Sequence, residues 1–199
     1  MIQIKNAAEL AQMRRACEIS AAALKAGGEA IEPGISTAEI DKIIYDFIVR
    51  HGARPNFLHL YGFPATACIS VNDTVIHGIP SRSQKIRPGD IVSIDTGCKI
   101  GGFNGDNACT YACGKVDLEA RRLMEVTKES LHRGIAMAQA GNRIGDISHA
   151  VQSYVEENGF SVVRSFVGHG VGKELHEDPE VPNFGNPGRG PRLVPGMTI

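Results

Sequence analysis

The chain has 199 residues, of which 42% are hydrophobic and 22% are charged. Its 21 Lys and Arg residues nearly balance its 22 Asp and Glu residues, which excludes a strong overall attraction to nucleic acid or an anionic membrane. No apolar segment approaches the roughly 20 residues that a membrane helix needs, and the N-terminus lacks a signal-peptide core. We therefore expect a single globular, cytoplasmic domain whose function depends on a local site, with neither DNA nor membrane as a partner.

The cysteines are five in number, and none forms a C-x-x-C pair of the zinc or redox kind. We expect reduced thiols, most of them small core residues. They are Cys17, Cys68, Cys98, Cys109 and Cys113.

An internal repeat organises the chain, because an offset of 107 residues superposes much of the first half on the second. The predicted halves are 7–112 and 114–199. Each half carries glycines, arginines and apolar residues at matching positions. Examples are Arg14, Leu24, Gly27, Gly34, Ile40 and Gly52, which fall on Arg121, Leu131, Gly134, Gly141, Ile147 and Gly159.

The first half begins with a predicted helix over 7–30, followed by a second helix over 37–51. Gly34 ends the turn between them, and Gly52 stands where a left-handed C-cap is expected. Strands are predicted at 67–71, 91–97 and 103–112, with a turn at 88–90 before the second of these. The first half is therefore predicted to place two helices on a sheet.

The second half repeats this order, with predicted helices over 118–138 and 144–158 and strands after them. Together the halves predict an α+β duplication. The same offset carries Pro88, Gly89 and Val92 onto Pro195, Gly196 and Ile199. We therefore expect the chain to stop inside a strand, and a counterpart of Asp95 would fall at position 202, past its last residue.

Two aspartates flank the turn around Ile100-Gly101-Gly102, at Asp95 and Asp106. If residues 100 and 101 form the loop, the aspartates lie directly opposite each other; if residues 101 and 102 do, Asp106 lies opposite Gly97. Both registers leave the carboxylates on one face, because side chains alternate along a strand. A divalent cation commonly neutralises such a pair, although an exposed acidic hairpin is the simpler alternative.

Three histidines are candidate functional residues. His169 lies between glycines in the segment 168–172, which lets the backbone pass close to another group, and imidazole is the usual neutral ligand of borderline divalent metals. His176 follows seven residues later, and His77 lies where a predicted strand gives way to a loop. A lone loop histidine is more often inert, so these residues carry weight only in combination.

The motifs together resemble the type I (bacterial-type) methionine aminopeptidases, which have the duplicated pita-bread fold, and the likeness extends over essentially the whole chain. Six stretches carry it: Cys68-Ile69-Ser70-Val71-Asn72, Ile76-His77-Gly78-Ile79-Pro80, Gly89 to Asp95, Gly105-Asp106, Gly168 to Gly172 with His176, and Pro195 to Ile199. The resemblance implies one pita-bread catalytic domain over 1–199, incomplete because its last strands are missing.

The resemblance also implies the site. Asp95, Asp106 and His169 would hold two divalent ions together with two glutamates that lie beyond residue 199, one of them at the place that the repeat assigns to position 202. His77 would hydrogen-bond the amide beyond the N-terminal methionine, and His176 would steady the carbonyl oxygen. The methionine pocket would include Phe63, Cys68 and Leu175, of which Phe63 and Leu175 differ from the residues often found there.

The implied activity is removal of the N-terminal methionine from nascent proteins and peptides. The metals would be cobalt, iron, manganese or zinc, and a complete enzyme would be a monomer. A transient ribosome contact is implied for such enzymes, yet the basic loop 81–87 is better interpreted as a solvated surface loop. With three ligands for two ions, the chain is predicted to be poorly active. The alternatives are a non-catalytic homologue that binds peptide or protein, and a prolidase-like peptidase, which usually carries a large extra N-terminal domain.

Overall fold

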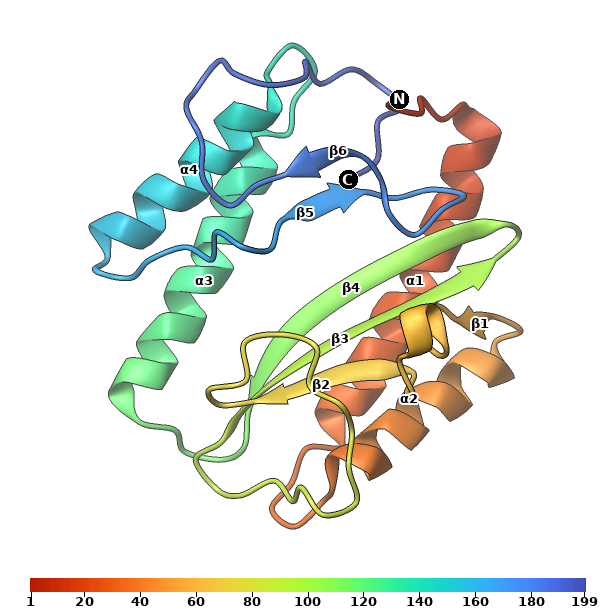
Figure 1. The fold of residues 1–199 in the computed structure, drawn as a ribbon, viewed down its shortest axis with the longest axis vertical. Coiled ribbons are helices and arrows are strands. Elements are labelled where there is room, and N and C mark those ends of the chain that lie inside the picture. The colour runs from red at the N-terminus through yellow and green to blue at the C-terminus, as the bar shows by residue number, and fades with distance from the viewer. The chain divides into compact units, whose positions relative to one another are not determined.

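The computed structural model describes all 199 residues, which form two compact units (Figure 1). The first unit comprises Ala8–Asp117 with the short segment Lys173–Leu175. The second unit comprises Met1–Ala7, Leu118–Gly172 and His176–Ile199. Their boundary at residues 117 and 118 lies near the predicted boundary between the repeat halves. The organisation of 1–199 as one catalytic domain stays a prediction.

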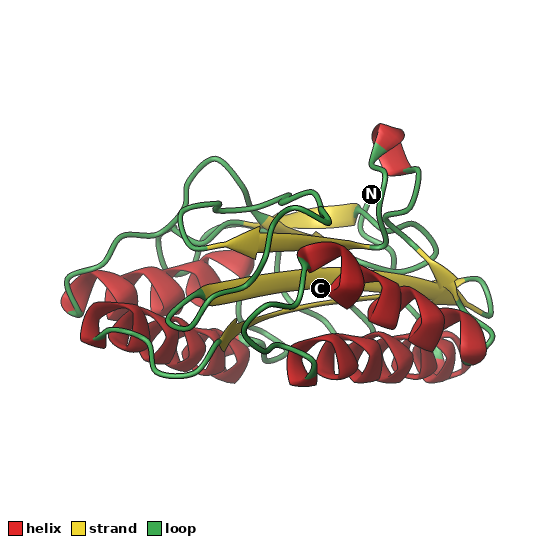
Figure 2. Cartoon of the chain, turned by 90° about the horizontal axis from the view of Figure 1, so that it is seen from below, coloured by secondary structure: helices red, strands yellow, loops and turns green.

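The first unit contains two helices, a single 3-10 turn and an antiparallel sheet. Strand β3 is central: β4 pairs along one edge, while β1 and β2 pair along the other. The helices cover one face of this sheet (Figure 2). The elements are α1 (Ala7–Glu29), α2 (Thr37–Arg50), β1 (Arg54–Pro55), η1 (Leu60–Gly62), β2 (Ala67–Val71), β3 (Ile91–Ile100) and β4 (Phe103–Ala112).

The core of the first unit lies between α2 and the helix-facing side of β3. Ile40, Ile44 and Ile48 recur every fourth residue on α2, so they form one stripe, and all three are fully buried. Val92 and Ile94 on β3 are equally buried in the same cluster. Each such side chain contributes about 1.5–3 kcal/mol on burial. This packing leaves the opposite face of β3 available for polar residues.

The second unit contains two helices and one two-stranded antiparallel ladder. Its core includes Ile144, Ile147 and Leu193, with Met137 and Val181 packed against them. The elements are α3 (Leu118–Met137), α4 (Ile144–Glu157), β5 (Gly168–Gly170) and β6 (Glu177–Val181). None of the chain's helices combines the length and apolarity needed to cross a bilayer.

The predicted repeat is confirmed within the units by matching backbone conformations. Gly34 and Gly141 have φ of 97° and 101°, and Gly89 and Gly196 have φ of 93° and 91°. These left-handed values are readily adopted only by glycine. Equivalent isolated bridges also recur, between Ser36 and Lys85 in the first unit and between Arg143 and Arg192 in the second.

The N-termini of α2 and α4 show the same repeat with one chemical difference. The Glu39 carboxylate accepts from the Ser36 N–H at 2.8 Å, and the Asp146 carboxylate accepts from the Arg143 N–H at 2.7 Å. Only the first copy adds the reciprocal bond, in which Ser36 Oγ accepts from the Glu39 N–H. A guanidinium has no acceptor, so Arg143 lacks that half of the motif.

The predicted helices agree with the structure to within one residue at their ends, and the strands 67–71 and 103–112 agree fully. Strand β3 extends three residues further than expected, to Ile100, because the hairpin turn is confined to Gly101 and Gly102. One prediction is wrong: the segment ending at Ile199 is not a strand. It contacts the neighbouring backbone through a bond from the Val171 N–H to the Thr198 carbonyl, whereas a strand needs a continuous ladder.

Candidate active site

The β3–β4 hairpin has the second of the two predicted registers, in which residues 101 and 102 form the loop. Ile100 pairs with Phe103, so Gly101 and Gly102 form the loop, with φ of 60° and 87°. Positive φ at both loop positions is the requirement of a type I′ turn. Asp106 consequently lies opposite Gly97 and diagonally across from Asp95, a spacing of about 7–8 Å between Cα atoms.

Close packing against α1 holds this hairpin in place. A Cβ on Gly105 would lie 2.5 Å from the backbone carbonyl of Ala16, so only glycine fits there. The next residue of α1 is Cys17, whose sulfur accepts a hydrogen bond from the Asp106 N–H. Burial, and then the charge of Asp106, raise the pKa of the Cys17 thiol. The backbone of Asp106 is therefore anchored by the helix behind it.

Cys68 borders the carboxylates from the other side of β3, where it pairs with Asp95. Its side chain is 5% exposed. Burial, followed by the charges of Asp95 and Asp106, raises the pKa of Cys68 to about 12. The thiol is thus neutral at physiological pH and presents an apolar surface beside the two carboxylates. Two adjacent carboxylates fit a divalent cation.

Strand β2 is positioned by a carboxylate of α2. Asp41 accepts hydrogen bonds from the backbone N–H groups of Thr66 and Ala67, at 2.9 and 2.8 Å. Burial raises the pKa of Asp41, the largest of several influences on it. These bonds set the start of β2 and hence the place of Cys68 next along the strand.

His77 lies in the loop after β2, is exposed, and has φ of 59°. The following residue is fixed: the Gly78 N–H donates to Ser70 Oγ at 3.0 Å, and the Gly78 carbonyl accepts from the Ile69 N–H at 2.8 Å. A Cβ on Gly78 would lie 2.2 Å from the Ile69 carbonyl oxygen. The loop therefore runs close along β2, and His77 is presented immediately before its anchor point.

Phe63 follows the 3-10 turn η1 and is half-buried. Its N–H donates to the Leu60 carbonyl at 2.9 Å, and its carbonyl accepts from the His59 N–H at 2.8 Å. His59 and Tyr61 both have positive φ in this turn. The turn has no strong sequence signal, since neither residue is a glycine.

In the second unit, His169 on β5 and His176 just before β6 form a T-shaped pair, with ring centroids 4.5 Å apart. The glycines around them are needed for space. A Cβ on Gly170 would lie 2.3 Å from the Asp178 carbonyl oxygen, and one on Gly172 would lie 2.4 Å from Glu177 Oε1. Gly170 thus permits the close backbone approach that was expected, whereas Gly172 leaves room for the side chain of Glu177.

The segment Lys173–Leu175 belongs to the first unit. The Lys173 carbonyl accepts two side-chain bonds, from Lys99 Nζ at 2.6 Å and from Asn104 Nδ2 at 2.9 Å. Its ammonium lies 2.9 Å from Glu9 Oε1. Leu175 is half-buried at the end of this anchored segment. None of these anchoring residues belongs to a recognisable motif, so the sequence did not reveal them.

The predicted site residues are therefore distributed over both units. The first unit brings Asp95 and Asp106 together on one sheet face, with Cys68 beside them, and also carries Phe63, His77 and Leu175. The second unit brings His169 and His176 together. Neither unit gathers three or more His, Cys, Asp or Glu side chains in a metal-binding group. All five cysteines are free, and Cys68, Cys98 and Cys113 are buried as expected.

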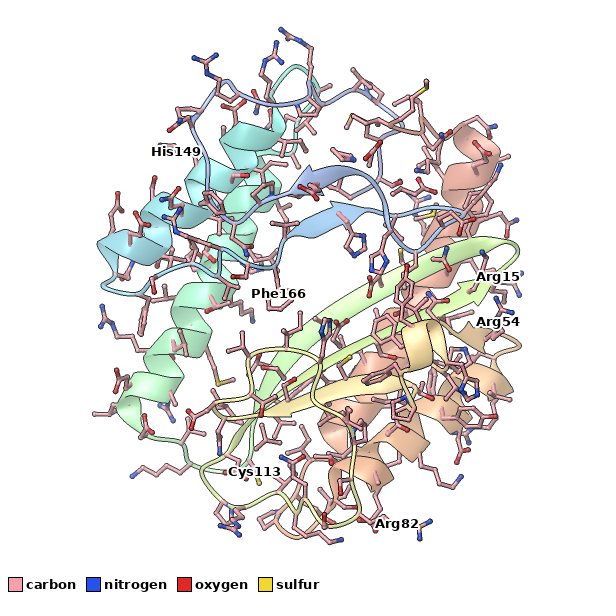
Figure 3. The ribbon with its side chains drawn as sticks, in the orientation of Figure 1. Arg15, Arg54, Arg82, Cys113, His149 and Phe166 are labelled. Atoms are coloured by element: carbon pink, nitrogen blue, oxygen red, sulfur yellow. The ribbon has the colours of Figure 1, made fainter.

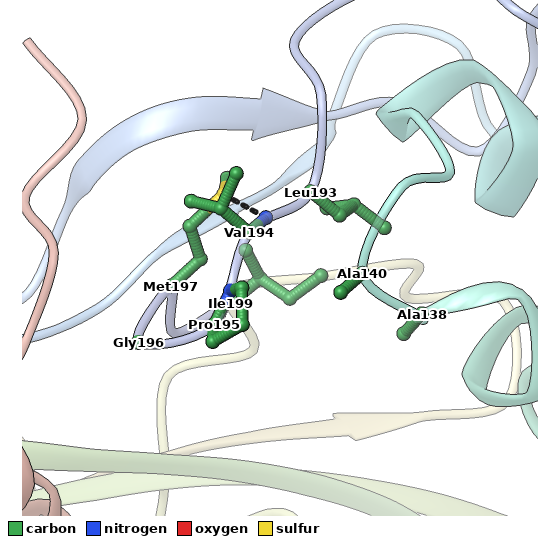
Figure 4. Close-up of a pocket in the computed structure, with 8 residues that line it drawn as sticks. All are labelled: Ala138, Ala140, Leu193, Val194, Pro195, Gly196, Met197 and Ile199. Atoms are coloured by element: carbon green, nitrogen blue, oxygen red, sulfur yellow. Dashed lines mark hydrogen bonds between the residues drawn. The ribbon is translucent and has the colours of Figure 1, made fainter.

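A cavity of about 210 Å³ lies in the second unit, and no predicted site residue is among those that line it (Figure 4). In the first unit, the repeat-equivalent residues Ile31, Ile86 and Val92 belong to or pack against the core cluster that also contains Cys113, which is labelled in Figure 3. There the Cys113 carbonyl accepts from the Gly89 N–H and the Cys113 N–H donates to the Asp90 carbonyl, each at 2.8 Å. The cavity of the second unit is lined by Ala138, Ala140, Leu193, Val194, Pro195, Gly196, Met197 and Ile199.

Comparison with known proteins defines the class first. The sequence model of metallopeptidase family M24 matches residues 11–199. A methionine aminopeptidase of Clostridium perfringens (strain 13 / Type A) is 53% identical over 199 residues, which are all of this chain and 80% of that protein. The crystal structure of methionine aminopeptidase from Thermotoga maritima has a TM-score of 0.97 at 41% identity, covering 99% of this chain and 79% of that one.

Prolidase from Pyrococcus furiosus is a more distant neighbour, with a TM-score of 0.83 at 25% identity, and this chain covers 55% of it. The chain therefore belongs to metallopeptidase family M24 and, within it, to the methionine aminopeptidases of the bacterial type I kind. The predicted family and its α+β pita-bread fold are confirmed. The prolidase-like alternative is less favoured, because the identity to the prolidase is 25% and the identities to the two methionine aminopeptidases are 53% and 41%.

Proposed function

We propose that the chain's active site removes the N-terminal methionine of nascent proteins and peptides by hydrolysis. One observation carries the proposal: Asp95 and Asp106 share one sheet face in a chain that is 53% identical to a methionine aminopeptidase. Adjacent carboxylates repel each other unless a cation lies between them, so their placement suits a metal site.

Asp95, Asp106 and His169 are the proposed metal ligands. Carboxylate oxygen and imidazole nitrogen together suit cobalt, iron, manganese or zinc as the two divalent ions. When bound, such ions polarise a carbonyl and lower the pKa of water toward neutrality. Two features of the chain help to position these ligands. The Asp106 N–H is hydrogen-bonded to the Cys17 sulfur, and the glycines around His169 leave room for β6.

His77 and His176 are the proposed substrate-contacting histidines. His77 would hydrogen-bond the amide beyond the methionine, and His176 would steady the scissile carbonyl oxygen as its negative charge grows. Phe63, Cys68 and Leu175 would line the methionine pocket, where an apolar and adaptable surface suits a thioether side chain. The neutral thiol of Cys68 is compatible with that role.

The chain of 199 residues is proposed to be a poor catalyst by itself, because the three ligands it supplies are few for two ions. We propose that the complete enzyme acts as a monomer in the cytoplasm on chains near the ribosome. Of the basic loop 81–87, Lys85 is paired with Glu39 at 3.1 Å, which leaves less charge for contacting RNA.

Methionine release from a Met-Gly-Met peptide tests this function. The 199-residue chain would be assayed with cobalt, manganese, iron or zinc, beside Asp95→Asn and Asp106→Asn variants. We expect slow, metal-dependent release that both variants abolish. Turnover equal to that of the Clostridium perfringens relative would contradict the proposed weakness of this chain. Binding of the peptide without any release, or cleavage only of an Xaa-Pro dipeptide, would contradict the proposed activity itself.

A further inference from the structure

A buried ion pair lies beside the two histidines of the second unit. Lys5 Nζ is 2.5 Å from Glu177 Oε2, and the two side chains are only 5% and 8% exposed. Lysine and glutamate are rarely buried unless they are paired, because removing their charges from water is costly. A buried ion pair often gives little net stability compared with apolar residues, so we look for its role in the geometry that it fixes.

Two glycines lie close against the ion pair, where a side chain would not fit. A Cβ on Gly172 would lie 2.4 Å from Glu177 Oε1 and 2.7 Å from Lys5 Cε, so a side chain there would displace both partners. On the other side, the Lys5 N–H donates to the Gly196 carbonyl at 2.8 Å, and a Cβ on Gly196 would lie 2.6 Å from the Lys5 carbonyl oxygen. Two glycines thus provide the space that Lys5 occupies.

The ion pair involves one residue pair of the β5–β6 ladder. Glu177 pairs with Gly170, and the ladder is irregular between His169 and Gly170. His176 immediately precedes Glu177, and His169 immediately precedes Gly170. An interaction that fixes the Glu177 side chain therefore also restrains the backbone next to His176 and, through the paired Gly170, the backbone next to His169. Those imidazoles are in edge contact, with centroids 4.5 Å apart.

We propose that Lys5 is a positioning residue, which acts through Glu177 to hold His176 in its edge contact with His169. The N-terminal segment of the chain thereby becomes part of the support of the active-site histidines. The catalytic consequence rests on the proposed function, since it requires His176 to contact the substrate carbonyl. The geometric consequence does not, because it concerns the two rings alone.

Nuclear magnetic resonance of the histidine rings tests the geometric part. A cross-peak between ring protons of His169 and His176 is expected in the wild-type chain, together with ring-current shifts. Lys5→Met should lose the cross-peak and the shifts, while Lys5→Arg, which keeps the positive charge, should retain them. Lys25→Met is the matched control, because Lys25 pairs with Glu29 at 3.6 Å on an exposed helix surface.

Retention of the cross-peak in a folded Lys5→Met variant would overturn the proposal, and so would its loss in Lys5→Arg to the same degree. If Lys5→Met does not fold, Glu177→Gln replaces it, because glutamine keeps the volume and removes the negative charge. A folded Glu177→Gln variant with unchanged ring contacts would equally overturn the proposal. A fall in melting temperature alone is the result expected of a purely structural role.

Kinetics separate this inference from the proposed function. Lys5→Met should lower the kcat for Met-Gly-Met by about 10²-fold, as a displaced catalytic group does, while KM changes little. If the wild-type chain hydrolyses no peptide yet the ring contacts depend on Lys5, the function fails and the positioning role stands. If turnover is present and independent of Lys5, the positioning role fails and the function stands.

Discussion

Asp106 lies directly opposite Gly97 in the β3–β4 ladder, so the position next to Asp95 on that face of β3 carries no side chain of its own. This register follows from the two-glycine turn at residues 101 and 102. The space beyond Gly97 is occupied, because a Cβ there would lie 3.0 Å from Asn56 Nδ2 and 3.4 Å from Phe57 Cε1. A side chain at position 97 would therefore press on the residues packed beside the two aspartates.

Gly97→Ala is expected to weaken metal binding and to destabilise the first unit. The new Cβ would lie 2.9 Å from the Gly105 carbonyl oxygen, a backbone atom that cannot easily move, and 3.0 Å from Asn56 Nδ2. Overpacking of this kind costs about 1–3 kcal/mol. Urea unfolding measures the stability and calorimetric titration with Mn²⁺ the affinity. An unchanged unfolding midpoint would show that β3 and β4 shift apart freely.

The thiol of Cys68 should become more acidic when the carboxylates beside it are neutralised. Its pKa is about 12, and burial is the larger cause, with Asp95 and Asp106 next. Asp95→Asn combined with Asp106→Asn should therefore lower the pKa without returning it to the ordinary value. The pH dependence of alkylation at Cys68, with the other four cysteines replaced by alanine, gives the measurement. A pKa that stays at about 12 would assign the whole shift to burial.

Glu39 should stabilise the chain at neutral pH and lose that effect in acid. Hydrogen bonds from Ser36, followed by Lys85, lower the pKa of Glu39 to about 2 in the folded chain. The unfolded value is higher, so the stabilisation is present above the unfolded pKa and disappears as the pH falls toward 2. The melting-temperature difference between wild type and Glu39→Gln should accordingly shrink between pH 5 and pH 2.

The repeat supplies the control for this experiment. Asp146 occupies the equivalent place in the second unit, and hydrogen bonds from the backbone N–H groups of Gly188 and Arg143 lower its pKa. Asp146→Asn should show the same direction of pH dependence. A difference that grows in acid at either site would contradict the capping role.

The ion pair of Lys5 should matter far more for stability than an exposed pair of the same type. Removing one partner of a buried pair costs about 3–5 kcal/mol, because the other charge is left buried and unpaired. Lys42 and Asp46 form an exposed pair at 2.8 Å, with side chains 72% and 44% exposed, and such pairs contribute about 0.2–1 kcal/mol. Urea unfolding of Lys5→Met and Lys42→Met compares them directly, and equal losses would refute the difference.

Much of the first unit could be predicted because its signals are local. Ile40, Ile44 and Ile48 recur at helical spacing, and Gly52 marks the end of α2. The register of the hairpin could not be decided, since Ile100-Gly101-Gly102 permits two loops, and only the paired structure selects one. The short strands β1 and β5 were missed because two or three residues carry no periodicity.

The candidate site divides in the same way. Asp95 and Asp106 could be placed on one face because side chains alternate along strands whatever the register. Lys5 and Glu177 could not be paired, because they are 172 residues apart and neither belongs to a repeating pattern. Contacts made by tertiary packing alone leave no periodic trace in a sequence.

The membership of Met1–Ala7 in the second unit has a consequence for the order in which the chain assembles. The first unit is nearly contiguous, so most of it can fold while the remainder of the chain is still being synthesised. Lys5 must instead wait for Glu177 and Gly196, which are synthesised long after it. The segment around Lys5 thus completes its folding late, and during that interval it stays accessible to chaperones and proteases.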